Sequence, residues 1–259
     1  MAGNDAENFA RLAAIVRELR AKCPWDREQT LATLGKHLIE EAYETADAID
    51  SQAASGIADE LGDLLAQSIF AAVIAEQETA LSLNQILTQA ADKLIRRHPH
   101  VYGENKAETA DEVVANWSRI KAEERRRAGA QSALDGVGRA MPALLRAEKL
   151  GLRARDAGMD WADIHAVLAK VREEMDEVEG ALSRNDLSAA AEELGDMLLA
   201  LGNAPRFIGQ SAEEVLRRAC DKFARRFRMV EARAAAKGLE LTQLTPAQID
   251  QLWQAVKLD

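Results

Sequence analysis

Apolar residues return every three to four positions along most of the chain, which is the pattern of amphipathic helices. Between residues 8 and 21 the apolar positions are Phe9, Leu12, Ala13, Ile15, Val16 and Leu19. The same spacing predicts further helices over 30–50, 56–78, 83–97 and 108–126, and then over 139–156, 161–183, 187–204, 211–236 and 245–257. Because the chain has only five prolines and few β-branched runs, this pattern predicts an all-α fold.

The two halves of the pattern repeat one another. "LIEEAYETADAI" (38–49) aligns with "VREEMDEVEGAL" (171–182), and "ADELGDLLA" (58–66) aligns with "AEELGDMLL" (191–199), both at an offset of 133 residues. "DKLIRRHPHV" (92–101) aligns with "DKFARRFRMV" (221–230), and "NWSRIK" (116–121) with "LWQAVK" (252–257). Anchors that keep one order with nearly constant spacing indicate a duplicated domain rather than a solenoid of short repeats.

The duplication predicts two helical domains joined by a short linker. We place the first copy at residues 1–125, the linker at 126–138 and the second copy at 139–259. Gly129, Gly136 and Gly138 interrupt the helical pattern in this linker. Each copy should then be a small bundle of four or five helices.

Acidic residues cluster on two neighbouring helices of each copy. Glu41 and Glu44 are three positions apart, as are Glu60 and Asp63 on the next helix, so each pair shares one helix face. The second copy repeats this arrangement with Glu173, Glu174, Glu177, Glu193 and Asp196. If the two helices pack against one another, four or five carboxylates converge, and a cation should balance their charge.

A purely oxygen donor set favours a hard metal ion. Neither acidic motif contains His or Cys, so Mg²⁺ or Mn²⁺ suits the motifs better than zinc does. The alternative is that these acids are the solvated faces of ordinary helices. Their repetition at identical internal spacing favours the metal site.

Basic and aromatic residues recur further along each copy. Lys93, Arg96 and Arg97 match Lys222, Arg225 and Arg226, and Trp117 with Lys121 matches Trp253 with Lys257. Arginine and lysine bind phosphate oxygens, and an indole can stack on a nucleobase. The cations could instead balance the acidic helices, and the Trp residues could be buried anchors.

The composition narrows the function classes. A net charge of −10 argues against general nucleic-acid binding. Two cysteines 197 positions apart suit neither a disulfide framework nor a zinc site, and no apolar run is long enough to cross a bilayer. We expect a protein of the cytoplasm with no membrane or nucleic-acid partner. The chain contains neither a Ser/His/Asp nor a Cys/His nucleophile pattern, and no glycine-rich phosphate loop.

These motifs together resemble the tandem-domain MazG family of nucleoside triphosphate pyrophosphohydrolases. The resemblance rests on "CPWDREQT" (23–30), "EEAYE" (40–44), "DELGDLL" (59–65), "RRHPHVY" (96–102), "EEMDEVE" (173–179), "EELGDML" (192–198) and "KFARRF" (222–227), and covers nearly the whole chain. It implies two tandem MazG-like helical bundles of the all-α NTP pyrophosphatase type. It also implies Mg²⁺-dependent hydrolysis of NTPs to NMP and diphosphate, with Mn²⁺ as another possible cofactor, broad nucleobase tolerance and an intertwined homodimer.

The resemblance also implies roles for residues at matching positions. In the second copy it assigns metal binding to Glu174, Glu177, Glu193 and Asp196, with Glu173 joining them in catalysis. It assigns nucleotide binding to Lys170, Glu173, Glu192, Lys222, Arg225, Arg226, Trp253 and Lys257. The matching residues of the first copy are Glu41, Glu44, Glu60 and Asp63, with Lys93, Arg97, Trp117 and Lys121. The family's activity is credited to the second copy.

The chain departs from the family pattern at two places, and two alternatives to the implied activity stay open. Family members often have a Lys just before the second "EELGD", where this chain has Ala189, Ala190 and Ala191, and Pro205 should kink or end its predicted helix. The chain could instead be a same-fold pyrophosphatase specialised for dUTP or damaged nucleotides. It could also be a regulator that binds nucleotide without turnover.

Overall fold

The computed structural model describes residues 4–104 and 106–257, and over these residues it is helical with no strand. The chain divides into two units, between Trp117 and Ser118. This division lies inside a helix and earlier than the predicted end of the first copy at residue 125. Residues 1–3 and 258–259, where the predicted domains begin and end, lie outside the described residues.

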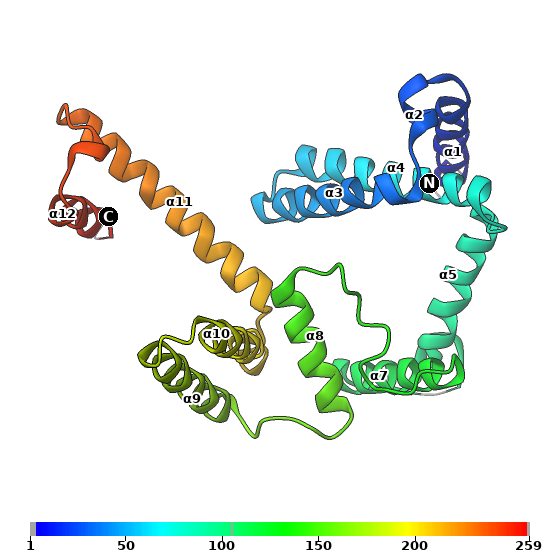
Figure 1. Ribbon diagram of the computed structural model, residues 1–259. Helices are drawn as coiled ribbons and strands as arrows, with labels where there is room; N and C mark the ends of the chain where they lie inside the picture. Colours follow the sequence, from blue (N-terminus) through cyan, green and yellow to red (C-terminus); the bar gives the residue numbers. More distant parts are fainter. Residues whose placement is uncertain (1–3, 105, 258–259) are drawn as a thin grey trace. The chain divides into compact units, whose positions relative to one another are not determined.

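The first unit contains α1 (Asp5–Lys22), α2 (Pro24–Glu28), α3 (Leu31–Ser51), α4 (Ala54–Glu78), α5 (Leu83–Arg97) and α6 (Pro99–Tyr102), and α7 (Ala110–Arg127) crosses into the second unit (Figure 1). Its core joins α1, α4 and the start of α5. Val16 and Val73 are almost completely buried there, with Ile69 and Leu83 beside them. The apolar positions predicted for residues 8–21 supply much of this core, although Ile15 and Leu19 are exposed.

The second unit contains α8 (Ala143–Asp156), α9 (Ile164–Ser183), α10 (Leu187–Leu201), the 3₁₀ helix η1 (Pro205–Ile208), α11 (Ala212–Ala236), the 3₁₀ turn η2 (Leu241–Gln243) and α12 (Pro246–Lys257). Val230 and Ala234 of α11 pack on Leu252 and Val256 of α12. Between α7 and α8 the chain is irregular, and Gly129 and Gly136 have positive φ angles of 89° and 79°. Such angles suit glycine, which has no Cβ.

Two prolines make the copies differ locally. α4 runs unbroken over 25 residues, whereas its counterpart α10 ends after 15 residues and is followed by η1, which begins at Pro205. Conversely, α5 ends just before Pro99, while α11 continues through the matching segment. Proline lacks the N–H that a helix interior requires, so each proline ends a helix that the other copy continues. The helix predicted over 187–204 therefore ends earlier, at Leu201, and Pro205 stands at the first position of η1.

Candidate functional site

Each candidate site lies on a helical hairpin, α3 with α4 in the first copy and α9 with α10 in the second. Three of the four acidic helices begin at polar caps, whereas α4 follows Ala53, which offers no side-chain cap. The Thr30 side chain accepts from Thr33 N–H before α3, and Asp163 and Asp186 likewise cap α9 and α10. Gln52 and Asn185, with φ angles of 57° and 56°, occupy equivalent positions in the two tight connections. The two connections therefore share one turn geometry, although only α10 has a side-chain cap at its start.

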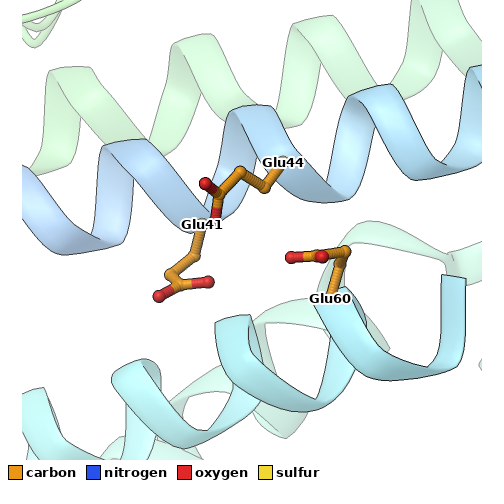
Figure 2. Close-up of side chains that lie close together, drawn as sticks. All are labelled: Glu41, Glu44 and Glu60. Atoms are coloured by element: carbon orange, nitrogen blue, oxygen red, sulfur yellow. The ribbon is translucent and has the colours of Figure 1, made fainter. Parts of the chain in front are cut away.

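In the first copy, Glu41 and Glu44 of α3 face Glu60 of α4 (Figure 2). One carboxylate oxygen from each residue lies within 4.8 Å of the other two. Burial raises the pKa of Glu60, and the charges of Glu44, Asp59, Asp63 and Glu41 raise it further. We call these three glutamates the N-terminal cluster. Asp63 is exposed and lies outside this group of three, so its role as a ligand stays a prediction.

The N-terminal cluster contains a buried oxygen without a hydrogen-bond donor. Within the described part of the chain, Glu41 Oε2 has no partner. A buried carboxylate oxygen without a donor is costly unless a cation balances it. The oxygen donors and this orphaned atom therefore fit a hard divalent cation.

In the second copy, Glu174, Glu177 and Glu193 form the matching C-terminal cluster, again with three oxygens within 4.8 Å of one another. Glu174 is buried, and a hydrogen bond from Lys170 holds its pKa below the ordinary value. Burial raises the pKa of Glu193, with further contributions from Glu177, Glu174, Asp196 and Glu192. Asp196 and Glu192 are exposed, so their predicted roles stay predictions.

Lys170 contacts two of the glutamates assigned to the site. Its Nζ lies 2.8 Å from Glu173 Oε1 and 2.6 Å from Glu174 Oε1. The hydrogen bonds to Glu173 and Glu174 raise the pKa of Lys170. Lys170 was assigned to the nucleotide from the family resemblance, whereas its pairing with a carboxylate of the cluster was not anticipated. The sequence could have indicated this pairing, because Lys170 stands four positions before Glu174 and such residues lie on one face of a helix.

The predicted nucleotide-binding residues lie on other helices. Lys222, Arg225 and Arg226 lie on α11 and Lys257 on α12, and Trp253 packs against Phe223 with ring centroids 5.3 Å apart. Among the described residues, no ion pair links Lys222, Arg225 or Arg226 to the C-terminal cluster. The hairpin thus assembles the carboxylates, and the roles of the basic residues stay predictions.

In the first copy the basic and aromatic residues lie on α5 and α7. The Arg97 guanidinium lies 5.9 Å from the centre of the Trp117 ring, a cation–π distance. Lys93 is exposed on α5 and Lys121 lies on α7. The pairing of Arg97 with Trp117 joins two members of the predicted set, whose contact with nucleotide stays a prediction.

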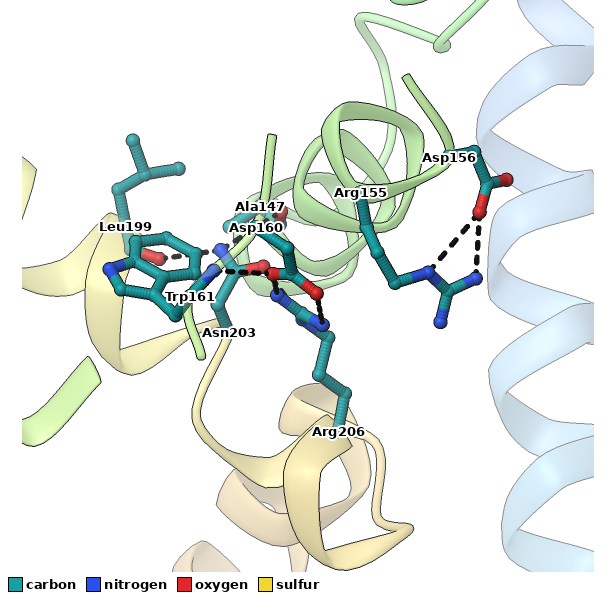
Figure 3. A network of polar contacts seen from close by, with 8 residues as sticks. All are labelled: Ala147, Arg155, Asp156, Asp160, Trp161, Leu199, Asn203 and Arg206. Carbon is teal, nitrogen blue, oxygen red and sulfur yellow. Dashed lines mark hydrogen bonds and ion pairs between the residues drawn. The ribbon is translucent and has the colours of Figure 1, made fainter. Parts of the chain in front are cut away.

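A polar network, which the sequence reasoning missed, connects the segment before α9 to the end of α10 (Figure 3). Arg206 binds both carboxylate oxygens of Asp160 and donates to Asn203 Oδ1. Asn203 is 1% exposed, and its Nδ2 donates to the carbonyl oxygens of Ala147 and Leu199. The network anchors η1 beside the hairpin that carries the C-terminal cluster. The sequence could not indicate this pair, because Arg206 and its partner Asp160 stand 46 positions apart.

None of the described helices combines the length and apolar character that a membrane span requires.

Comparisons with known proteins agree with this architecture. The family model of the MazG nucleotide pyrophosphohydrolase domain matches residues 29–102 and 163–230, one segment in each unit. The chain is 44% identical over 252 residues to the nucleoside triphosphate pyrophosphohydrolase of Escherichia coli (strain K12), covering 95% of this chain and 96% of that protein. It is 35% identical over 251 residues to the nucleoside triphosphate pyrophosphohydrolase/pyrophosphatase MazG of Thermotoga maritima, covering 96% and 95%.

A solved structure also aligns with part of the chain. The mazG-related protein from Thermotoga maritima is 26% identical, with a TM-score of 0.39, and the alignment covers 43% of this chain and 97% of that one. The family match in both units and the end-to-end similarity to curated relatives lead to one conclusion. The chain belongs to the MazG nucleotide pyrophosphohydrolase family.

Proposed function

We propose that this protein hydrolyses nucleoside triphosphates to nucleoside monophosphate and diphosphate, with Mg²⁺ as cofactor and with broad nucleobase tolerance. Relatives that match it almost end to end carry the name nucleoside triphosphate pyrophosphohydrolase. The observation that carries the proposal is the convergence of Glu174 and Glu177 of α9 with Glu193 of α10, whose carboxylate oxygens lie within 4.8 Å of one another. A hairpin that only needed to pack would not require three acids between its helices.

The donor set supports Mg²⁺, with Mn²⁺ as a substitute. Glu174, Glu177 and Glu193 offer oxygen atoms alone, and Asp196 follows one turn after Glu193. A bound Mg²⁺ would neutralise triphosphate charge and polarise a water molecule for attack on the α-phosphorus. The N-terminal cluster offers the equivalent residues Glu41, Glu44, Glu60 and Asp63.

The remaining residues would bind the substrate and handle a proton. Lys222, Arg225, Arg226 and Lys257 would hold phosphate oxygens. Trp253 would stack on the base without reading its edge, which would give the proposed broad tolerance. Glu173 is exposed at the cluster and would accept the proton of the attacking water. The new bond joins the water oxygen to the α-phosphorus, the bond to the β-phosphate bridging oxygen breaks, and diphosphate leaves.

We also propose that the protein is a homodimer. Both hairpins expose large apolar side chains in the single chain: Ile49 is 52% and Leu61 47% exposed in the first, and Leu187 is 68% and Leu198 55% exposed in the second. Such a concentration on adjacent helices is typical of a covered surface. Size-exclusion chromatography with light scattering should give twice the mass of the 28.3 kDa chain, and a monomer at micromolar concentration would contradict this part of the proposal.

The decisive experiment incubates the purified protein with ATP, GTP, CTP, UTP, dUTP and an oxidised purine triphosphate, each with Mg²⁺. Product analysis should find the monophosphate and diphosphate for several bases at comparable rates. Turnover of dUTP or the oxidised nucleotide alone would support the specialised alternative. Release of orthophosphate with a nucleoside diphosphate would overturn the proposal, as would binding without turnover.

A further inference from the structure

The two carboxylate clusters share the same three glutamates but differ in one internal charge. We propose that Lys170 is a built-in counter-ion of the C-terminal cluster, so that without nucleotide this cluster binds a divalent cation more weakly than the N-terminal cluster does. The inference rests on the proposed function only in treating both clusters as cation sites. It goes beyond that function by making the two copies unequal in the absence of substrate.

The geometry of Lys170 supports this role. Its Nζ lies 2.6 Å from Glu174 Oε1, within a cluster whose oxygens already lie within 4.8 Å of one another. The Glu174 side chain is only 4% exposed, whereas the Lys170 side chain is 39% exposed, so water reaches the pair from the lysine side while the carboxylate is buried. The ammonium therefore already neutralises one of the negative charges that a divalent cation would bind.

The first copy has a different residue at the same position. His37 stands 133 positions before Lys170, and its Nδ1 lies 3.5 Å from Glu40 Oε2, the counterpart of Glu173. The His37 ring also packs edge-on against Trp25, with centroids 6.2 Å apart. Glu41, the counterpart of Glu174, keeps a buried oxygen for which the described residues offer no hydrogen-bond donor. Among the residues that the structure describes, the N-terminal cluster thus has no counterpart of the Lys170 ammonium.

The difference has a functional consequence for the second copy. A divalent cation approaching Glu174 must share that carboxylate with Lys170 or displace the ammonium. A triphosphate offers the ammonium another set of anionic oxygens, and Lys170 is already among the residues assigned to the nucleotide. Cation and nucleotide should therefore bind the C-terminal cluster cooperatively, each raising the affinity for the other by the same factor.

Mn²⁺ binding to the full-length protein, followed by electron paramagnetic resonance without nucleotide, tests the inference. Glu60→Gln leaves the C-terminal cluster intact, and Glu193→Gln leaves the N-terminal cluster intact. The Glu193→Gln protein should bind Mn²⁺ more tightly than the Glu60→Gln protein. In the Glu60→Gln background, Lys170→Met should lower the Mn²⁺ dissociation constant by about tenfold, because it removes a positive charge that competes with the ion for Glu174.

Two matched variants separate charge from packing. Lys170→Arg keeps the positive charge and should leave the dissociation constant close to that of the Glu60→Gln parent. In the Glu193→Gln background, His37→Lys introduces the charge into the first copy and should raise the constant about tenfold. Circular dichroism and thermal unfolding select the variants that are folded.

An unchanged or higher Mn²⁺ dissociation constant after Lys170→Met would overturn the inference. Absence of Mn²⁺ binding by both single-cluster proteins would overturn it as well. Because these titrations contain no nucleotide, their failure is distinguishable from failure of the proposed hydrolysis, which the product assay reads separately.

Discussion

Gln52 and Asn185 stand at equivalent positions of the two copies and share a left-handed backbone, with φ angles of 57° and 56°. They are the only residues other than glycine with positive φ among those that the structure describes. Each lies in the connection between the two helices that carry a carboxylate cluster. The turn geometry has therefore been kept in both copies, although the side chain at the turn differs.

This equivalence predicts a stabilising substitution. Asparagine adopts the left-handed region more readily than glutamine, so Gln52→Asn should raise the free energy of unfolding by about 0.5 kcal/mol. Asn185→Gln should lower it by a similar amount. Urea denaturation of the two variants measures both changes, and opposite signs from those given would show that the turns are governed by other contacts.

The Asp160–Arg206 pair predicts a large loss of stability when it is broken. The Arg206 side chain is 8% exposed, its Nη1 lies 3.1 Å from Asp160 Oδ2, and the guanidinium packs on Phe207 at 4.2 Å. Arg206→Met should cost about 2 kcal/mol, because it removes the guanidinium and leaves the partly buried Asp160 carboxylate with the Trp161 N–H as its remaining donor among the described residues. Urea denaturation measures the loss. Arg155→Met is the matched control, since its pair with Asp156 is more exposed and should change stability by less than about 0.5 kcal/mol.

The same pair predicts a pH dependence. Hydrogen bonding from Arg206 holds the pKa of Asp160 below its ordinary value of 3.8. The unfolded chain therefore takes up a proton at a higher pH than the folded chain does. The stabilisation is present above pH 3.8 and is lost as the pH falls through the lower pKa of the folded state. The stability difference between wild type and Asp160→Asn should be constant from pH 5 to 7 and should shrink below pH 4. A difference that grows on acidification would contradict this assignment.

Substitutions in the two clusters identify the catalytic copy. Glu193→Gln should lower kcat/KM for NTP hydrolysis by about 100-fold, because it removes one of three converging carboxylates. Glu60→Gln, at the equivalent position, should leave most of the activity. Steady-state kinetics of diphosphate release measure both variants. Retained activity in Glu193→Gln with loss in Glu60→Gln would move catalysis to the first copy.

Trp253 should contribute to binding rather than to base selection. Trp253→Leu should raise KM about tenfold for all four common NTPs, as expected when one stacking surface is lost. Because Trp253 also packs on Phe223, Phe223→Leu is the control for disturbed packing and should change KM less. A KM change confined to one base would show that the pocket reads base edges.

Much of the fold could be predicted because local forces dominate in it. Helices predicted over 30–50 and 83–97 are observed at Leu31–Ser51 and Leu83–Arg97, since periodicity and capping residues act over only a few positions. The short helices α2 and α6 were not predicted, because five and four residues are too few to show a period. The interruption near Pro205 was also predictable, because proline's missing N–H acts locally, but α10 already ends at Leu201 and Pro205 begins η1.

The candidate site could be predicted only in part. The fixed spacing of Glu174, Glu177 and Glu193 on two adjacent helices was enough to anticipate their convergence. The spacing could not anticipate that Lys170 reaches Glu174 while His37 turns to Glu40 and Trp25. Which partner a long side chain takes depends on its rotamer and on the packing around it.

The sequence alone determined the helical class, the duplication and the residue types of both clusters, because periodicity and repetition are properties of the chain itself. The tertiary structure determined which charged side chains come into contact. It brought Arg206 to Asp160 over 46 positions and left a buried oxygen of Glu41 without a donor among the described residues, while Glu174 received one. Such differences arise when helices pack, because burial and the distance between side chains set the electrostatic energy of each carboxylate.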